Sequence, residues 1–357
     1  MSALTFQVAE RSDEPDLRRL LRENPLGGSY AISLEREPDA FAADFGLSER
    51  HDFVVARRND TGEAVGMCEQ LVAPAFVDGK VVRLPYIGGL RVARSHRHRI
   101  AVLRGGFAAL RQAATDRNVV PFALTSIAID NDEARRLLTA GLPGLPQYTP
   151  ADRFSTFLLR PRKGQAGERV RPACDEDMPA LAAFLQERLS RYQFAPVWTA
   201  ERLLRCAPPQ RFLLWRDGRA IRGSVCVWDQ RSRRQTVVRS YPSLVARLRR
   251  LLNLLSPIGG FPAFPPKGSA LAAAFLSHLA TEDDPTILHD LLRAALSEAS
   301  RSGLKIAVLG CARAHPWREL IRRTWRCVEY RTDLYRVHWD AVPALGQRLA
   351  MPEVALL

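Results

Sequence analysis

The sequence predicts an α/β (α+β) protein made of two similar halves, each a mixed, mostly antiparallel central sheet flanked by helices. Three observations lead to this fold class. The chain has 357 residues, about twice the usual size of one domain. Hydrophobic residues make up 46% and charged residues 25%, which is typical of globular chains and not of disordered ones. The order of elements expected in the first half repeats in the second.

The boundary between the halves falls in a polar segment. Residues 161–167 read Pro-Arg-Lys-Gly-Gln-Ala-Gly, a composition typical of linkers. Both halves then begin alike, with a short strand, an acidic turn and an apolar-periodic helix. We therefore expect a first domain over 1–162, a linker over 163–167, a second domain over 168–340 and a tail over 341–357.

Local patterns justify each element of the first half. The helix expected over 15–23 has Leu17, Leu20 and Leu21 on one face. Alternating apolar residues predict strands on both sides of an Asn-Asp-Thr-Gly turn at 59–62. The order expected after the first helix is strand 53–57, strand 63–73, strand 80–92, basic loop 94–99, helix 100–117, strand 122–129, helix 132–140 and strand 154–159.

The second half repeats this order with one insertion. Its first helix, expected over 178–190, has Leu181, Phe184 and Leu185 facing inward. A helix over 243–254 and a Pro/Gly-rich loop over 256–268 have no counterpart in the first half. The other elements expected are strands 212–215, 221–228 and 276–281, helix 285–302, strand 304–309, helix 316–325 and strand 330–337.

The charge is strongly positive. The formal net charge is +14, and only four of the 52 basic residues are Lys. Such a balance attracts polyanions in general, but the skew toward Arg is equally typical of an Arg-rich surface without a dedicated partner. The basic clusters at 94–99 and 231–234 are short, so we do not expect nucleic acid as the partner. Binding to a phosphate backbone would weaken steeply with added salt, which discriminates that alternative.

Other features of the sequence bear on metal binding, on the role of the cysteines and on localisation. The six cysteines show no CxxC spacing and the seven histidines no HExxH motif, so we expect no metal. Cys68, Cys226 and Cys311 lie in apolar runs and are interpreted as small buried hydrophobic residues. The sequence has no run of 18 apolar residues and no visible secretory signal. The expectation is a cytoplasmic protein without a membrane partner, as a monomer or a homodimer.

Two passages resemble the GCN5-related N-acetyltransferase (GNAT) superfamily, in tandem. The passage from Leu90 to Phe107 is similar to the family's strand, Arg-containing loop and helix, which hold the coenzyme A pyrophosphate. The passage from Asn131 to Gly141 is similar to the helix after the family's fifth strand, whose Asn lies near the thioester. The resemblance covers one copy per half and implies acetyl-CoA or another acyl-CoA as substrate.

The resemblance also implies binding residues. The strand backbone near Leu90 and Val92 would pair with the pantetheine arm, as a peptide adds to a sheet edge. The residues expected at the cofactor are Leu90, Val92, Arg97, His98, Arg99, Ile100, Ala101, Val102 and Asn131. Ile100 and Val102 stand at the family's glycine positions, and Leu138 stands where a tyrosine donor is frequent. The corresponding loop of the second half, 282–285, has extra carboxylates, which is typical of a degenerate copy without coenzyme A.

Candidates for proton transfer lie on the expected strands and turns. They are Glu69, Tyr86, Asp130 and Tyr148. Each has an ordinary structural alternative: a solvated strand face for Glu69, packing for the two tyrosines, and a turn or helix cap for Asp130. Tyr86 precedes Gly88-Gly89, and paired glycines in a strand indicate a bulge or a close ligand approach.

Together these features predict an acyltransferase that moves an acetyl or other acyl group from acyl-CoA to an amine by direct attack. The acceptor would be a small molecule or a peptide. The alternative is a catalytically inactive binding module of the same fold, for an anionic ligand or a protein partner. The six tryptophans, all in the second half, are interpreted as core, with an acceptor pocket between the halves as the alternative.

Overall fold

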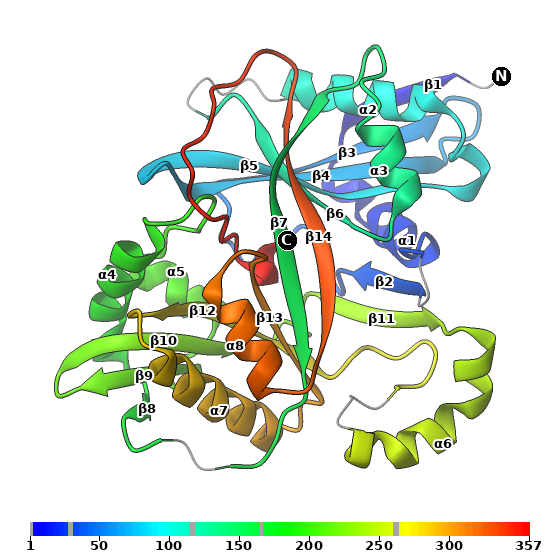
Figure 1. The fold of residues 1–357 in the computed structure, drawn as a ribbon. Coiled ribbons are helices and arrows are strands. Elements are labelled where there is room, and N and C mark those ends of the chain that lie inside the picture. Colours follow the sequence, from blue (N-terminus) through cyan, green and yellow to red (C-terminus); the bar gives the residue numbers. More distant parts are fainter. Residues whose placement is uncertain (1–2, 28–30, 114–118, 165–166, 260–263) are drawn as a thin grey trace.

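Twelve strands form one continuous sheet that passes through both halves of the chain (Figure 1). A computed structural model describes residues 3–27, 31–113, 119–164, 167–259 and 264–357. In sheet order the strands are β1 (Leu4–Val8), β3 (Arg50–Arg58), β4 (Ala64–Val77), β5 (Lys80–Val92), β6 (Ala123–Ala128), β14 (Cys327–His338), β7 (Gln147–Leu159), β13 (Ile306–Ala312), β12 (Ala273–Thr281), β10 (Ala220–Trp228), β9 (Phe212–Asp217) and β8 (Val170–Pro172).

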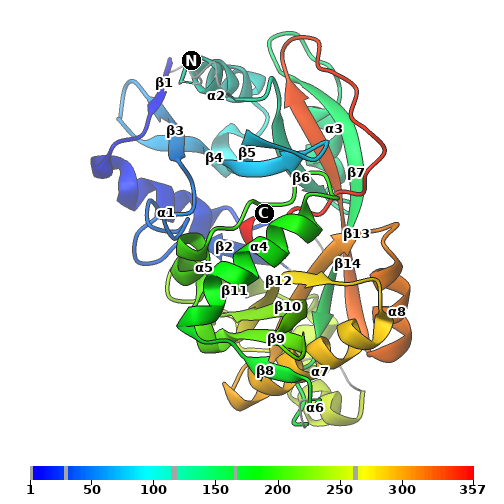
Figure 2. The ribbon, with the colours of Figure 1, turned by 90° about the vertical axis from the view of Figure 1, so that its left-hand side faces the viewer.

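Helices cover both faces of this sheet in each half. In the first half α1 (Glu14–Glu23) lies on one face and α2 (Ile100–Ala113) on the other, and in the second half α4 (Met178–Leu189) and α7 (Pro285–Arg301) do the same (Figure 2). The predicted fold class is confirmed. The remaining helical segments are α3 (Asp132–Leu138), α5 (Ala200–Cys206), α6 (Ser243–Gly259), α8 (Pro316–Thr324) and the short turns η1 (Arg11–Asp13), η2 (Arg94–His96), η3 (Asp175–Asp177), η4 (Pro209–Arg211) and η5 (Val354–Leu356).

The two halves exchange their last strands. The final strand of the second half, β14, pairs antiparallel with both β6 and β7 of the first half. Strand β7 pairs in turn with β13 of the second half, so each half's sheet contains a strand of the other. The ladder between β14 and β7 runs from Cys327–Leu159 to His338–Gln147. The element order restarts at the predicted boundary, but the hydrogen-bonded sheet does not stop there.

Most elements agree with the expectations, and the main differences have physical causes. Strands β7 and β14 are longer than the predicted 154–159 and 330–337, because they pair with each other along their whole length. Helix α2 is described to Ala113, and the rest of the predicted helix, 114–117, lies outside the described residues. So do residues 165–166 of the predicted linker and 260–263 of the predicted loop.

Three elements were not predicted. Strands β2 (Ala31–Glu35) and β11 (Gln235–Ser240) form a separate two-stranded antiparallel sheet between the halves, and α5 follows α4. Each strand forms an isolated bridge with a segment near it in sequence, Ile32 with Leu26 and Val237 with Ala270. Its main ladder partner comes from the other half, and the sequence pattern does not reveal that partner.

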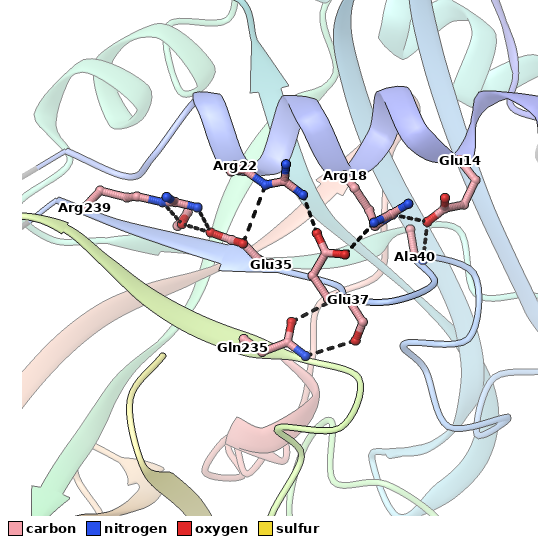
Figure 3. A network of polar contacts seen from close by, with 9 residues as sticks. Glu14, Arg18, Arg22, Glu35, Glu37, Ala40, Gln235 and Arg239 are labelled. Carbon is pink, nitrogen blue, oxygen red and sulfur yellow. Dashed lines mark hydrogen bonds and ion pairs between the residues drawn. The ribbon is translucent and has the colours of Figure 1, made fainter. Parts of the chain in front are cut away.

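A polar network fastens this small sheet to α1 (Figure 3). Arg239 of β11 forms an ion pair with Glu35 of β2. Gln235 exchanges two hydrogen bonds with the backbone of Glu37, at 3.0 and 2.9 Å. The Glu37 carboxylate pairs in turn with Arg18 and Arg22 of α1, at 2.5 and 2.6 Å. The contacts between the halves therefore include ion pairs as well as the shared strands.

The largest apolar core lies in the second half. Trp198, Trp215 and Trp228 are buried in it, which confirms the core interpretation for these three. Trp317, Trp325 and Trp339 are half-buried. The predicted burial of Cys68, Cys226 and Cys311 is confirmed.

Candidate functional site

Strands β5 and β6 separate at the centre of the first half. They run parallel and pair only where Tyr86 meets Leu124. Past that point β5 continues along β4, and its contact with β6 is made by side chains. Thr125 donates from Oγ1 to the Ile87 carbonyl at 2.8 Å, and the Tyr86 hydroxyl lies 3.0 Å from Ser126 Oγ. Beyond Ile87, the edge of β5 that faces β6 is thus without a strand partner among the described residues, and such an edge can accept an extended ligand.

A bulge interrupts β5 just after this separation. Gly88 pairs with Glu69 of β4 and Arg91 pairs with Met67, so two residues of β5 oppose one of β4. Gly89, in the bulge, has φ of +59°, a conformation that favours glycine. The sequence predicted a bulge or close approach at the paired glycines, and the bulge is confirmed. A bulge leaves backbone amides without ladder partners, which makes them available to a ligand.

The bulge is closely packed against Glu69. A Cβ atom added at Gly89 would lie 3.2 Å from both Cβ and Oε2 of Glu69. At Gly88 it would lie 2.9 Å from Cε1 of Tyr86. These contacts put two of the predicted proton-transfer residues directly beside the bulge.

The Glu69 carboxylate is buried and paired, which the prediction of a solvated strand face did not anticipate. Only 2% of the residue is exposed, and Oε1 accepts a hydrogen bond of 2.8 Å from His51 Nε2 while Oε2 pairs with Arg36. Burial raises the pKa of Glu69, but the charge of Arg36 and the hydrogen bond to His51 outweigh it and bring the pKa to about 2. Glu69 is therefore ionised at neutral pH.

The surroundings of Glu69 include further cations that sequence reasoning missed. Arg91 and Arg234 lie within electrostatic reach of it, and burial lowers the pKa of each to about 10. His51 keeps a buried Nδ1 without a hydrogen-bond partner among the described residues. These residues come from strands and loops far apart in sequence, so only their basic character was visible beforehand.

The loop after β5 carries the predicted basic cluster. Four basic side chains at the start of α2 are exposed to solvent: Arg94, Arg97, His98 and Arg99. The first turn of α2 contains no acidic residue. The first N–H groups of a helix have no partner within the helix, and the helix dipole adds positive charge there. This end of α2 can therefore bind an anion such as a pyrophosphate.

The two residues at the family's glycine positions have their own place in the core. Val102 is buried among Ala56 and Val65, and Ile100 packs against a second apolar cluster beside β3. Ala101, between them, is exposed. The bulky side chains at 100 and 102 thus fill the space under α2.

The other predicted residues lie on or beside α3 and on β7. Asn131 caps α3, since its Oδ1 accepts from the Ala134 amide at 3.2 Å, and Asp130 beside it is exposed. Tyr148, on β7, packs against Tyr335, and burial raises its pKa. A small apolar cavity lies beneath α2, lined by residues that include Val54, Cys68, Leu90, Leu103 and Phe107. In the part of the chain that the structure describes, no three His, Cys, Asp or Glu side chains gather as metal ligands would.

The second half contains the same bulge, but there it is filled. Ser277 pairs with Cys226 and Ala280 with Ser224, and His278 in between has φ of +54°. The His278 amide donates to Oε2 of Glu353 at 2.9 Å. A carboxylate from the end of the chain thus accepts the hydrogen bond that a ligand would take at this bulge.

The His278 ring closes the same place from inside. It is buried between Trp198 and Phe212, with ring centroids 4.1 and 5.2 Å away, and burial lowers its pKa to about 3. At the corresponding helix start, Glu282 pairs with Arg222 at 2.7 Å and Arg188 at 3.1 Å. In the second half, side chains of the chain itself thus fill the bulge and pair the charged groups at the helix start.

Glu353 should make stability depend on pH. Burial raises its pKa from 4.5 to about 7, so the folded chain retains a proton that the unfolded chain releases. Between pH 5 and pH 8.5 the wild type should lose about 2 kcal/mol of unfolding free energy relative to Glu353→Gln, as the pH passes the folded pKa. Urea denaturation at several pH values measures this difference. Glu187→Gln, at an exposed position, should show no such trend, and parallel curves for wild type and Glu353→Gln would contradict the assignment.

Comparisons with solved structures agree with this arrangement. Saccharomyces cerevisiae N-myristoyltransferase with bound myristoyl-CoA is similar with a TM-score of 0.65 and 13% sequence identity, over 96% of this chain and 84% of that one. A GCN5-related N-acetyltransferase from Sphaerobacter thermophilus is similar with a TM-score of 0.55 and 15% identity, over 96% and 98%. No family model and no curated protein matches the sequence. The chain has the tandem GNAT fold that its sequence predicted.

Proposed function

We propose that the first half binds an acyl-CoA between β5 and β6 and transfers the acyl group to an amine. The observation that carries this is the open bulge at Gly88–Gly89, at the point where the two strands separate and just before the cationic start of α2. The pantetheine arm lies along Leu90 and Val92. The pyrophosphate lies at the start of α2, with the charges of Arg97 and Arg99, the His98 ring and the amides of Ile100 and Ala101. The Val102 amide already donates to the Arg99 carbonyl at 3.0 Å, so Val102 borders this site without an amide to offer. Asn131 borders the thioester end. The similarity to a structure holding myristoyl-CoA supports this assignment.

The bulge provides the chemistry of direct attack. The amine nitrogen forms a bond to the thioester carbonyl carbon, and the oxyanion that develops is stabilised by backbone N–H groups of the bulge. The C–S bond then breaks, coenzyme A leaves as a thiolate that takes up a proton, and the product is an amide. No covalent enzyme intermediate is needed, because both substrates are held in place at once.

The proton of the attacking amine leaves through the groups beside the bulge. Glu69 alone is a weak base, because its pKa is about 2. We assign the acceptor role to His51, whose Nε2 is held by Glu69 and whose Nδ1 is unpaired within the described residues. Tyr86, whose pKa is raised by burial, is the proton donor to the leaving thiolate. Asp130 and Tyr148 stay candidates: Tyr148 packs against the apolar cluster that contains Ile87, next to the bulge, and Asp130 is exposed.

Calorimetric titration with acetyl-CoA and longer acyl-CoAs tests the cofactor site. Arg97→Ala/Arg99→Ala should weaken binding at least about 100-fold, because two hydrogen bonds to charged groups are lost and each contributes about 1.5–3 kcal/mol. Arg301→Ala/Arg323→Ala removes two exposed arginines of the second half and should leave the affinity unchanged. Unaltered affinity in the first variant would place the pyrophosphate elsewhere.

An inactive binding module is the second candidate. The ion pairing of Glu69, with its low pKa, favours it, since this carboxylate does not act as a base at neutral pH. Release of free coenzyme A in the presence of a panel of amines separates the two candidates. An enzyme releases thiol only with a suitable amine, whereas a binding module binds acyl-CoA and releases none. A folded chain that binds no acyl-CoA at all would refute the proposed function.

A further inference from the structure

Helix α6 stands apart from the twelve-stranded sheet, at the outer end of the small sheet (Figure 1). It belongs to the insertion that has no counterpart in the first half. Its inner side is tied to the following segment, where Asn253 exchanges hydrogen bonds of 2.9 and 2.7 Å with the Phe264 backbone. Arg249 also donates to the Phe264 carbonyl, at 3.2 Å. The helix and the segment that follows it are therefore joined by three hydrogen bonds.

The outer side of α6 is a row of exposed leucines. Leu244, Leu248, Leu251 and Leu254 are 68%, 40%, 53% and 75% exposed. Their spacing of four, three and three residues places them on one face of a helix. They are four of the ten large hydrophobic residues that are exposed in the described part of the chain. Such a concentration on one helix marks an interaction surface, since single exposed leucines are ordinary but a contiguous row is not.

The charges on this helix have one sign. Residues 243–259 contain three arginines and no Asp or Glu. Arg247 and Arg250 are exposed beside the leucine row, and neither has an ion-pair partner among the described residues. These two arginines therefore give the leucine row a positively charged border. The net charge of the whole chain, +14, has the same sign as the charge of this helix.

We propose that α6 binds the surface of an anionic lipid membrane, lying in the interface with its leucine row in the acyl region. Two properties of the helix fit such a surface. Its leucine row can be buried among the acyl chains, and the flanking arginines can reach the lipid phosphates. A second copy of this chain fits less well, because packing two such faces together would bring their unpaired arginines close without any carboxylate on the helix to compensate. None of the described helices is long and apolar enough to cross a membrane.

The sequence analysis predicted no membrane partner, and the exposure of these leucines was not visible there because it depends on how the helix packs. The proposal does not depend on the acyl-CoA site.

Flotation of the full chain with vesicles tests the proposal. The wild type should float with phosphatidylcholine vesicles that contain phosphatidylglycerol, and at least tenfold less with pure phosphatidylcholine. Arg247→Ala/Arg250→Ala should weaken binding about 10- to 30-fold, since each juxtamembrane cation contributes about tenfold or somewhat less. Leu244→Ser/Leu248→Ser/Leu251→Ser should abolish it. The matched control, Val81→Ser/Leu204→Ser/Val328→Ser, removes three exposed apolar residues elsewhere and should bind like the wild type.

Thermal melts establish that each variant is folded, and all substituted side chains are exposed. Absence of flotation with anionic vesicles, or equal flotation of wild type and the leucine variant, would overturn the proposal. So would a concentration-dependent dimer, seen by light scattering, that disappears in the leucine variant while no vesicle binding occurs. That result would assign the leucine row to a second copy of the chain.

Discussion

Replacing Glu69 with alanine is expected to destabilise the folded chain by about 3–5 kcal/mol, the cost of leaving a buried cation without its counter-charge. Its carboxylate is buried and holds both Arg36 and His51. Arg91 and Arg234 are also near enough to feel its charge. Removing it leaves several cations together in the interior. Urea denaturation measures the loss, and Glu63→Ala, at a half-exposed carboxylate 3.8 Å from Arg58, should cost less than about 1 kcal/mol.

The same residue gives the protein an acid limit. Because the folded pKa of Glu69, about 2, is below the unfolded value of 4.5, its ionised form stabilises the fold above pH 4.5. That contribution is lost as the pH falls from 4.5 toward 2. The unfolding free energy of the wild type should therefore fall more steeply in this range than that of Glu69→Gln, which keeps the shape and loses the charge. Equal slopes would show that Arg36 and His51 are stabilised by other groups.

The sequence predicted the features of the site that are local. Strand 80–92 has the bounds that were predicted, and paired glycines within a strand are a direct signal of the bulge. The basic residues before α2 were visible as a cluster. Val102 was predicted at the cofactor loop, whereas its burial against Ala56 depends on strand order.

The features that were not predicted depend on contacts between distant residues. Glu69 was predicted as a candidate for proton transfer, with a solvated strand face as the alternative, and nothing near it in sequence shows that Arg36 and His51 cover it. Strand exchange between β7 and β14 is equally invisible, since apolar alternation predicts a strand but not its partner. Helix α6 was predicted as a helix, while the exposure of its leucines follows from its place outside the sheet.

The two bulges show how one fold gives two outcomes. At the first, the left-handed residue is Gly89 and β5 has an open edge toward β6. At the second, the left-handed residue is His278, whose amide is bonded to Glu353 and whose ring fills the space. The same backbone geometry thus leaves one bulge open and has the other filled by side chains of the chain itself, which is why the acyl donor is proposed to bind at the first.

Replacing Gly89 with alanine is expected to lower the turnover of the proposed acyl transfer about 100-fold, with little change in acyl-CoA affinity. The reason is positional. A Cβ atom at this residue would lie 3.2 Å from Glu69, so the bulge must shift by a few tenths of an ångström. Removing one hydrogen-bond donor to an oxyanion lowers enzyme turnover about 10²- to 10³-fold. A small displacement of such a donor costs a substantial part of that factor. The proposed pyrophosphate site at α2 is separate from the bulge, so binding should persist.

Gly141→Ala is the matched control for this prediction. Gly141 also has a left-handed φ, +63°, but no atom lies within 4 Å of a Cβ added there. Both variants carry the strain of placing alanine in this conformation, about 1–2 kcal/mol of stability, whereas only Gly89→Ala disturbs the bulge. Stability should therefore fall in both variants, whereas turnover should fall only in Gly89→Ala. If both variants retain turnover, the bulge amides do not stabilise the transition state; if both lose it equally, the effect is general strain, and the site assigned to the first half must be placed elsewhere.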